Sequence, residues 1–360
     1  MRCYKFIITR PAARRSGGSE ISTSVVRPLV PGIYAPLPTF FKADSEDLDV
    51  ESQAAHVIRL VKAGVKPLLG GTMGEAHHLS HDERATLIKL TRKALDDAGY
   101  ADVPIIAGTG AGSTRETIQL SKEAAAAGAD YTIVIASGYF AGALANNRKA
   151  LKAFWSEVAE ESPIPVIIYN YPGAAGGIDL DSDLITELAE SSPNLAGVKL
   201  TCGNVGKLTR ICATVSEPSF AQAHPRKNPH APFLVLGGYT DFILTSSMVN
   251  GHGAITGLAN VVPQYTVAKL FEISEKTKVD LSALPEAQRL QGIVARADFT
   301  IAKTGIAGTK ALLGKLYGYG GHPRRPLPPI EAEVVDALWR HPHTTELIAM
   351  ERELSGKAQS

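Results

Sequence analysis

Eight short segments rich in apolar and β-branched residues recur along the chain, and longer stretches with helical periodicity separate them. The segments are residues 32–37, 65–69, 103–107, 131–135, 164–169, 195–199, 232–236 and 253–256. Strands that alternate with helices are typical of βα units and a parallel sheet. Eight such units predict a closed (β/α)8 TIM barrel, because closure removes the sheet edges that an open sheet must protect. The alternative is a doubly wound open sheet.

Local signals indicate helices between these strands. Apolar residues repeat at helical spacing over residues 50–61, which predicts an amphipathic helix. Ser80 with Glu83, and Ser113 with Glu116, predict capping boxes, in which a hydroxyl and a carboxylate bind free amides of the first helical turn.

The barrel accounts for only part of the chain. A barrel of this kind typically takes about 250 residues, whereas the chain has 360. We assign residues 29–262 to the barrel and residues 263–360 to a carboxyl-terminal helical region. Helical stretches are predicted there at residues 285–303, 308–316 and 330–338.

Residues 1–28 form a basic amino-terminal extension. No acidic residue precedes Glu20, and the basic residues before it are Arg2, Lys5, Arg10, Arg14 and Arg15. This charge pattern is typical of an organelle transit peptide, so we expect a mitochondrial protein. The alternative is a basic tail on a cytoplasmic protein.

Composition narrows the classes of partner. A net charge of +1 gives no overall electrostatic support for binding nucleic acid or membrane surfaces. No apolar run approaches the length of a membrane span. The three cysteines fit neither a disulfide framework nor a zinc site. We therefore expect a small-molecule partner, without nucleic acid or membrane.

A lysine ends the sixth predicted strand. Lys199 closes an apolar run just before a turn that starts a helix. The working residues of a parallel barrel lie at the carboxyl ends of its strands. A lysine that is desolvated there loses its proton more easily and becomes a nucleophile toward ketones. The alternative is a lysine whose ammonium group reaches solvent.

Other strand ends carry further candidates. The second predicted strand ends in GGTMGE at residues 70–75, the fourth in SGYF at 137–140 and the fifth in YNYP at 169–172. Amides of the glycine-rich turn can bind a carboxylate or phosphate, although a turn without a ligand also fits. Glu75 is either an acid or base, or a carboxylate held by turn amides. Residues 108–113 lack the third glycine of a dinucleotide fingerprint, so no nicotinamide cofactor is expected.

Three histidines follow the glycine-rich turn. His77, His78 and His81 lie near Glu75 in the sequence, which suggests a metal site. They do not form the His-Glu-x-x-His arrangement, and His81 falls in the first turn of a predicted helix, away from the strand end. We therefore expect no metal. Aldol cleavage without a metal needs an amine, which Lys199 supplies.

Three motifs together resemble the dihydrodipicolinate synthase and N-acetylneuraminate lyase family of class I, pyruvate-dependent aldolases. They are GTMGE at residues 71–75, YNYP at 169–172 and GVKLTCGN at 197–204. Their order, spacing and placement at strand ends agree with the family from about residue 31 to the end of the barrel. The resemblance implies an enzyme that needs no cofactor and that assembles as a homotetramer built from dimers.

The resemblance also implies catalytic roles. Lys199 would form the Schiff base, and Tyr169 would be the general acid and base. Tyr139 resembles the family's second tyrosine, which crosses a subunit interface and relays protons with Thr72.

A substrate-binding set is implied as well. Gly71, Thr72 and Met73 would hold the carboxylate of the pyruvyl unit, and Ile255 completes the expected set.

Two departures from the family pattern narrow the range of activities that we expect. Met73 stands where dihydrodipicolinate synthases carry a second hydroxyl, and residues 173–177 lack the arginine that binds their second substrate's carboxylate. Dihydrodipicolinate synthase activity is therefore disfavoured.

Two aldol substrates remain. One is 4-hydroxy-2-oxoglutarate, which yields pyruvate and glyoxylate. The other is L-threo-3-deoxy-hexulosonate, which yields pyruvate and glyceraldehyde. The basic amino terminus favours the first, and the uncharged stretch at residues 173–177 favours the second. We expect 4-hydroxy-2-oxoglutarate. A non-catalytic protein that binds 2-oxo acids is a further alternative, but it would need neither Lys199 nor Tyr169.

Overall fold

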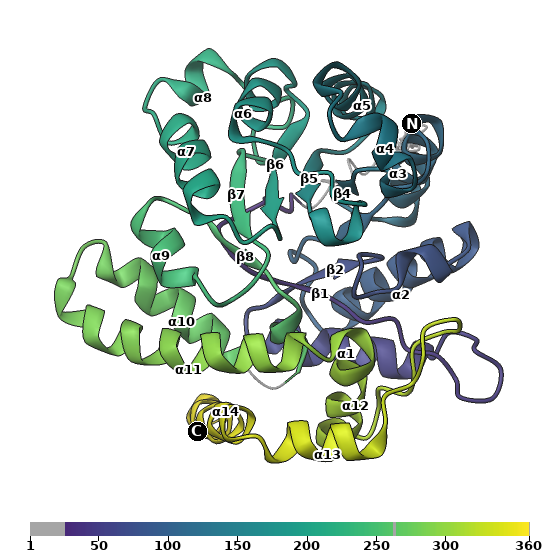
Figure 1. The fold of residues 1–360 in the computed structure, drawn as a ribbon, viewed down its shortest axis with the longest axis vertical. Coiled ribbons are helices and arrows are strands. Elements are labelled where there is room, and N and C mark those ends of the chain that lie inside the picture. Colours follow the sequence, from purple (N-terminus) through teal and green to yellow (C-terminus); the bar gives the residue numbers. More distant parts are fainter. Residues whose placement is uncertain (1–25, 262–263, 360) are drawn as a thin grey trace, which may run out of the picture.

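The computed structural model describes residues 26–261 and 264–359. Its parallel strands form a closed barrel in sequence order, and the last strand pairs with the first (Figure 1). The predicted (β/α)8 barrel is therefore confirmed, and the open sheet is excluded. The strands are β1 (Gly32–Pro36), β2 (Lys66–Leu69), β3 (Ile106–Gly108), β4 (Tyr131–Ile135), β5 (Val166–Asn170), β6 (Leu195–Leu200), β7 (Leu234–Gly237) and β8 (Gly253–Ile255).

Helices surround the barrel. The longer ones are α1 (Val50–Lys62), α2 (His81–Asp97), α3 (Thr114–Ala127), α5 (Arg148–Glu161), α6 (Ser182–Ser191), α7 (Val205–Val215) and α10 (Gln264–Thr277). Shorter ones are α4 (Ala141–Leu144), α8 (Phe220–Ala223) and α9 (Ile243–Met248), with 3-10 turns η1 (Ala76–His78), η2 (Gly138–Phe140), η3 (Pro172–Ala174), η4 (Gly257–Asn260) and η5 (Leu281–Ala283). No helix in the described part of the chain is long and apolar enough to span a bilayer.

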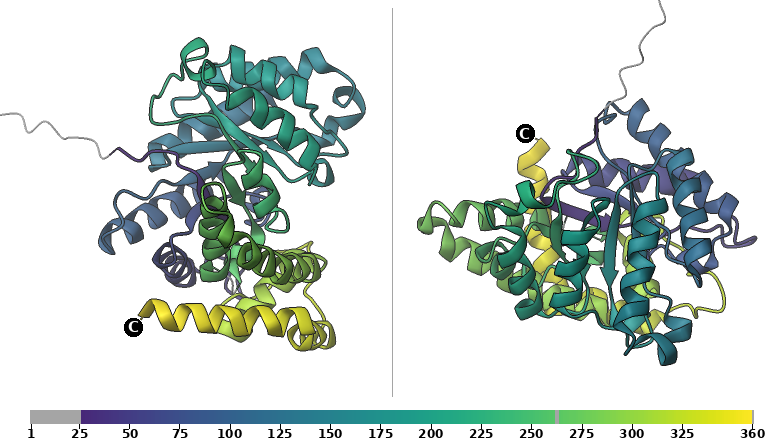
Figure 2. Two further views of the ribbon diagram at one scale, coloured as in Figure 1. Left: turned by 90° about the vertical axis from the view of Figure 1, so that its left-hand side faces the viewer. Right: turned by 90° about the horizontal axis from the view of Figure 1, so that it is seen from above.

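The remaining helices extend the barrel. They are α11 (Leu284–Ala302), α12 (Gly305–Tyr317), α13 (Ala332–Arg340) and α14 (Pro342–Gln359), and they pack together on one side of the molecule (Figure 2). The boundary that we predicted at residue 262 precedes α10. That helix buries Val267 and Leu270 in the same core cluster as Ile33 of β1. The basic extension predicted at residues 1–28 lies almost entirely outside the described residues.

The two predicted capping boxes differ in outcome. At α2 the box is complete, since Ser80 Oγ accepts from the Glu83 amide and Glu83 Oε2 accepts from the Ser80 amide. At α3, Ser113 Oγ accepts from the Glu116 amide at 3.1 Å, but the Glu116 carboxylate contacts His81 Nε2 at 2.7 Å. The second prediction is therefore only half right, because His81 of the neighbouring helix binds the Glu116 carboxylate.

A bulge in β6 changes which side chains face the barrel interior. Val166 of β5 pairs with Leu195, but Ile167 pairs with Gly197, so Ala196 is an extra residue. Ala196 packs in the interior cluster, whereas Val198 packs in the cluster between sheet and helices. Because strand side chains alternate with a period of two, the bulge is what turns Lys199 toward the interior.

Gly197 makes this bulge possible. Its φ angle is +148°, and a Cβ atom there would lie 2.4 Å from the carbonyl oxygen of Leu234 on β7. A side chain would therefore force β6 and β7 apart and strain the backbone.

We expect Gly197→Ala to lower the free energy of unfolding by about 1–3 kcal/mol, since it adds both positive-φ strain and a clash. Chemical denaturation measured by circular dichroism would show this as an earlier midpoint. Gly112→Ala is the matched control, because a Cβ atom added there would have no other atom within 4 Å and its φ is not positive. Equal midpoints for the two variants would contradict the role of Gly197.

Candidate active site

Lys199 lies near the carboxyl end of β6 with its side chain enclosed by the protein. It is 5% exposed, and within the described residues no carboxylate pairs with it. Burial without a counter-charge penalises the ammonium form, and it lowers the pKa of Lys199 to about 7. Much of this amine is therefore neutral and nucleophilic near neutral pH.

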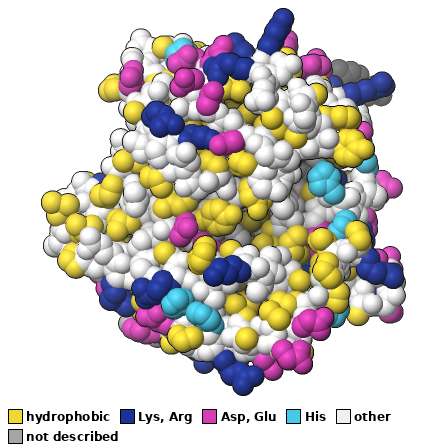
Figure 3. Space-filling view, viewed as in Figure 1, with side chains coloured by type: hydrophobic (Ala, Val, Ile, Leu, Met, Phe, Trp, Pro, Cys, Tyr) yellow, Lys and Arg dark blue, Asp and Glu magenta, His cyan; other side chains and the backbone are white. Residues whose placement is uncertain are grey.

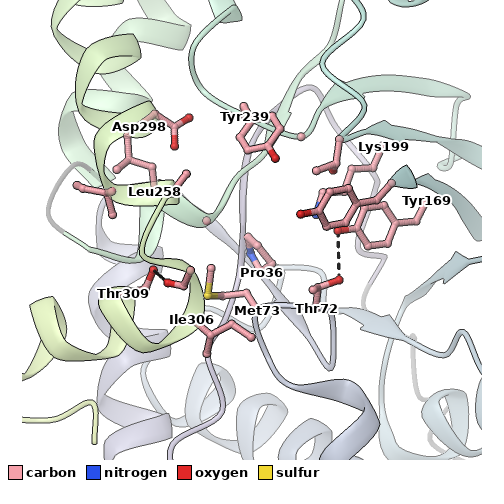
Figure 4. Close-up of a pocket in the computed structure, with 17 residues that line it drawn as sticks. Pro36, Thr72, Met73, Tyr169, Lys199, Tyr239, Leu258, Asp298, Ile306 and Thr309 are labelled. Atoms are coloured by element: carbon pink, nitrogen blue, oxygen red, sulfur yellow. Dashed lines mark hydrogen bonds between the residues drawn. The ribbon is translucent and has the colours of Figure 1, made fainter. Parts of the chain in front are cut away.

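Tyr169 stands beside Lys199 on the adjacent strand. The two residues pair in the β5–β6 register, and Lys199 Nζ lies 4.2 Å from the centre of the Tyr169 ring. The Tyr169 hydroxyl is 3.3 Å from Thr72 Oγ1 (Figure 4). Burial raises the pKa of Tyr169, while the Thr72 hydroxyl acts in the opposite direction. Tyr169 is thus a protonated phenol within reach of a second hydroxyl, an arrangement that can move a proton.

These side chains line a cavity of about 170 Å³. The space-filling view shows a hollow in this face of the molecule, bordered largely by hydrophobic side chains (Figure 3). One wall comes from strands and the turns after them, and the other comes from η4, α11 and α12 (Figure 4). The lining residues are Pro36, Thr72, Met73, Tyr169, Tyr171, Lys199, Thr201, Gly238, Tyr239, Gly257, Leu258, Asp298, Ile301, Ala302, Gly305, Ile306 and Thr309.

A second cavity of about 240 Å³ borders the first. Thr72, Tyr169 and Ile306 line both cavities, and Gly71 lines only the second. The turn after β2 therefore contributes to both spaces. Lys199, Tyr169, Thr72 and Met73 come together as the sequence predicted, and Gly71 lies next to them in the neighbouring space.

Two other predicted residues lie elsewhere. Ile255 is fully buried in the cluster inside the barrel, and the residues after β8, Gly257 and Leu258, line the cavity instead. Tyr139 is 92% exposed in this chain, with its ring edge-on to Phe140 at 5.1 Å. Its expected role at the site of another subunit stays a prediction.

Glu75 is a carboxylate bound within the fold, but its partners are not the turn amides that we predicted. It is buried, forms an ion pair with Lys310 of α12, and accepts a hydrogen bond from the Arg324 amide at 2.8 Å. The same carboxylate contacts His78 Nδ1 at 3.0 Å. Glu75 therefore ties the turn after β2 to the carboxyl-terminal helices.

The histidines do not converge. His78 pairs with Glu75, whereas His81 pairs with Glu116 and with Glu123 of α3. In the described part of the chain, no group of three or more His, Cys, Asp or Glu side chains is placed to hold a metal ion.

Sequence reasoning missed several residues of the cavity. Thr201 directly follows β6, two positions after Lys199, and Tyr239 follows β7, so their positions relative to strand ends could have indicated both. Asp298 is a lone acidic residue among the buried positions of α11, with Val294, Ala297 and Ile301. A charge within an apolar helix face was the available signal for it.

Comparison with known proteins identifies the family. The model of the dihydrodipicolinate synthetase family matches residues 30–341. The chain belongs to this family. An L-threo-3-deoxy-hexylosonate aldolase of Aspergillus niger is 42% identical over 321 residues, covering 86% of this chain and 93% of the relative. A protein of Emericella nidulans, named "Probable 4-hydroxy-2-oxoglutarate aldolase, mitochondrial", is 44% identical over 332 residues, covering 92% of this chain and 99% of the relative.

A solved structure of the family has the same fold. YagE of Escherichia coli, determined in complex with pyruvate, superposes with a TM-score of 0.71 at 26% identity, covering 91% of this chain and 99% of its own. Since the relatives above 40% identity are named aldolases, this family member is an enzyme of the carbon–carbon lyase class.

Proposed function

We propose that the protein is a Schiff-base aldolase that cleaves a 4-hydroxy-2-oxo acid to pyruvate and an aldehyde. The observation that carries the proposal is a buried, unpaired Lys199 with a pKa of about 7 beside the hydroxyl pair of Tyr169 and Thr72. A structural lysine gains nothing from such burial, whereas an amine nucleophile requires it. The pyruvate complex of YagE supports the same ligand class.

The steps follow from these side chains. Neutral Lys199 attacks C2 of the substrate, and loss of water leaves a protonated imine that withdraws electrons from C3. Tyr169 takes the proton of the C4 hydroxyl while its own phenolic proton passes to the Thr72 hydroxyl, which gives a proton to water; the C3–C4 bond breaks, and the aldehyde departs. The remaining enamine takes a proton at C3, and water then releases pyruvate and restores Lys199. In this scheme Thr72 orients Tyr169 through their hydrogen bond, and amides of the turn at Gly71, Thr72 and Met73 hold the substrate's C1 carboxylate.

The relatives' names support two substrates, 4-hydroxy-2-oxoglutarate and a 3-deoxy-hexulosonate. Both would give pyruvate by the same steps. Dihydrodipicolinate synthesis fits less well, because residues 173–177 offer no guanidinium group for a second carboxylate. That stretch packs tightly instead: a Cβ atom on Gly176, whose φ is +61°, would lie 2.6 Å from the Gly138 carbonyl oxygen.

Assembly and location are part of the proposal. The exposed pair Tyr139 and Phe140 on η2 supports a subunit interface in a homotetramer, which sedimentation velocity would test. The basic residues before Glu20 and the word mitochondrial in the name of the Emericella nidulans relative support import into mitochondria, which cell fractionation would test.

The rate should depend on pH through Lys199. Because only the neutral amine attacks, we expect kcat/KM to rise about tenfold per pH unit below the pKa and to level off above about pH 7. Pyruvate release measured between about pH 5 and pH 9 would show this profile. A rise that continues up to pH 9, as the ordinary lysine pKa of about 10.4 would give, would contradict the desolvated amine.

Reductive trapping tests the mechanism directly. Incubation with pyruvate and borohydride should add a stable label to Lys199, which peptide mass spectrometry locates. No label in the presence of bound pyruvate would favour the non-catalytic alternative instead.

A further inference from the structure

The wall of the cavity that faces Lys199 has an unusual polar composition. Asp298 lies across the cavity from Lys199 and Tyr169, with Tyr239 between them (Figure 4). Around it stand the apolar side chains of Leu258, Ile301 and Ile306. Among the described residues that line this cavity, Lys199 is the single cationic side chain. The far wall therefore offers a carboxyl group and no positive charge.

Asp298 is held in place from one side only. Its Oδ2 atom accepts hydrogen bonds from the Thr240 amide at 2.7 Å and from Thr240 Oγ1 at 2.5 Å. Gln291 fixes the same loop by donating to the Thr240 carbonyl at 2.9 Å. In the described structure Oδ1 of Asp298 has no hydrogen-bond partner. The free oxygen is therefore available to a ligand in the cavity.

Burying this carboxyl group has an energetic cost that its hydrogen bonds from Thr240 offset only in part. Asp298 is 4% exposed, and burial raises its pKa to about 6. No lysine, arginine or histidine of the described chain forms an ion pair with it. A buried carboxyl without a cation destabilises a protein, so its presence in a cavity points to a role in binding.

The substrate's tail would meet this wall. In the proposed mechanism, C2 is attached to Lys199 and the C1 carboxylate lies at the turn after β2, so the atoms beyond C4 must occupy the rest of the cavity. A tail carboxylate would face Asp298 without a cation to neutralise either group. A tail hydroxyl would instead donate to the free Oδ1, and hydrogen bonds to charged groups are the stronger ones.

We propose that Asp298 selects the substrate by accepting a hydrogen bond from a hydroxyl on the tail. The enzyme then prefers 2-oxo acids with an uncharged, hydroxylated tail, such as a 3-deoxy-hexulosonate, over those that end in a second carboxylate, such as 4-hydroxy-2-oxoglutarate. This inference rests on the proposed aldolase function.

Steady-state kinetics with both substrates tests it, using the full-length enzyme and its Asp298→Asn variant. The asparagine keeps the shape and can still accept from Thr240. We expect the natural enzyme to favour the hexulosonate in kcat/KM. In the variant, kcat/KM for the hexulosonate should fall about ten- to a hundredfold, because one hydrogen bond to a charged group is lost. The kcat/KM for 4-hydroxy-2-oxoglutarate should stay level or rise. Trapping of pyruvate on Lys199 should be unchanged.

The control is Glu286→Gln, since Glu286 belongs to α11 like Asp298 but is exposed and does not line the cavity. It should leave both kcat/KM values unchanged. A natural enzyme that prefers 4-hydroxy-2-oxoglutarate overturns the proposal without any variant. An equal fall for both substrates in Asp298→Asn also overturns it, since that result indicates a structural role. Absence of pyruvate trapping in the natural enzyme would instead reject the aldolase mechanism itself.

Discussion

Replacing Lys199 by methionine should abolish aldol cleavage. Methionine keeps much of the volume but has no amine, so neither the Schiff base nor the electron-withdrawing imine can form. We expect kcat to fall by roughly 10⁴-fold or more, as when the nucleophile of a covalent mechanism is removed. Pyruvate release measures the rate, and borohydride should no longer attach pyruvate to the protein.

A second lysine of the barrel provides the matched control. Lys66 begins β2, and burial also lowers its pKa. It lies at the opposite end of the barrel from Lys199, with its Nζ atom 5.3 Å from the centre of the Tyr34 ring. Lys66→Met should therefore keep its activity, because the amino-terminal ends of barrel strands serve stability. Substantial activity in Lys199→Met, or an equal loss in Lys66→Met, would contradict our assignment.

The second large effect is expected at Tyr169. Tyr169→Phe removes one hydroxyl and leaves the ring that packs beside Lys199. We expect kcat to fall about 10²- to 10⁴-fold, the usual contribution of a general acid or base. Trapping of pyruvate on Lys199 should persist, because pyruvate has no C4 hydroxyl to deprotonate. Rapid-quench measurement reports cleavage of the C3–C4 bond, and the trapping assay reports formation of the Schiff base, so the two assays together separate these steps.

Tyr131→Phe is the comparison for this variant. Tyr131 is also buried in the barrel, and its hydroxyl donates to the Arg27 carbonyl at 2.8 Å, away from the cavity. Its loss should cost stability and leave kcat unchanged. If both variants lowered kcat equally, the effect of Tyr169 would come from packing and not from proton transfer.

The strands and the core of the site were predictable because they depend on local sequence. Apolar runs fix the strands, and a parallel barrel gathers strand ends, so Lys199, Tyr169 and Thr72 had to meet. Strand limits were less certain. The third strand was expected to begin at Val103 but begins at Ile106, because the Val103 carbonyl accepts from Arg92 and the Ile105 amide donates to Asp130.

The opposite wall was not predictable from strand patterns. Asp298 and Ile306 come from helices about 100 residues beyond Lys199 in the sequence, and their placement depends on how α11 and α12 pack. The buried pair of Glu75 and Lys310 is one contact that fixes this packing, and nothing in the local sequence of either residue indicates the other. For the same reason the expected residue Ile255 lies inside the barrel while Leu258 lines the cavity, since the depth at which a strand meets the cavity is a property of the assembled barrel.

The side-chain alternation that follows the bulge in β6 makes the active site sensitive to a kind of genetic change that side-chain chemistry would not reveal. Loss of a single codon at Val198, with the reading frame kept, would move Lys199 into the outward-facing position that Val198 holds opposite Ile168. Lys199 would then turn toward the helix layer, although the lysine itself and every other component of the site would remain encoded. Inheritance of this activity therefore depends on the number of residues in β6 as strictly as on their identity.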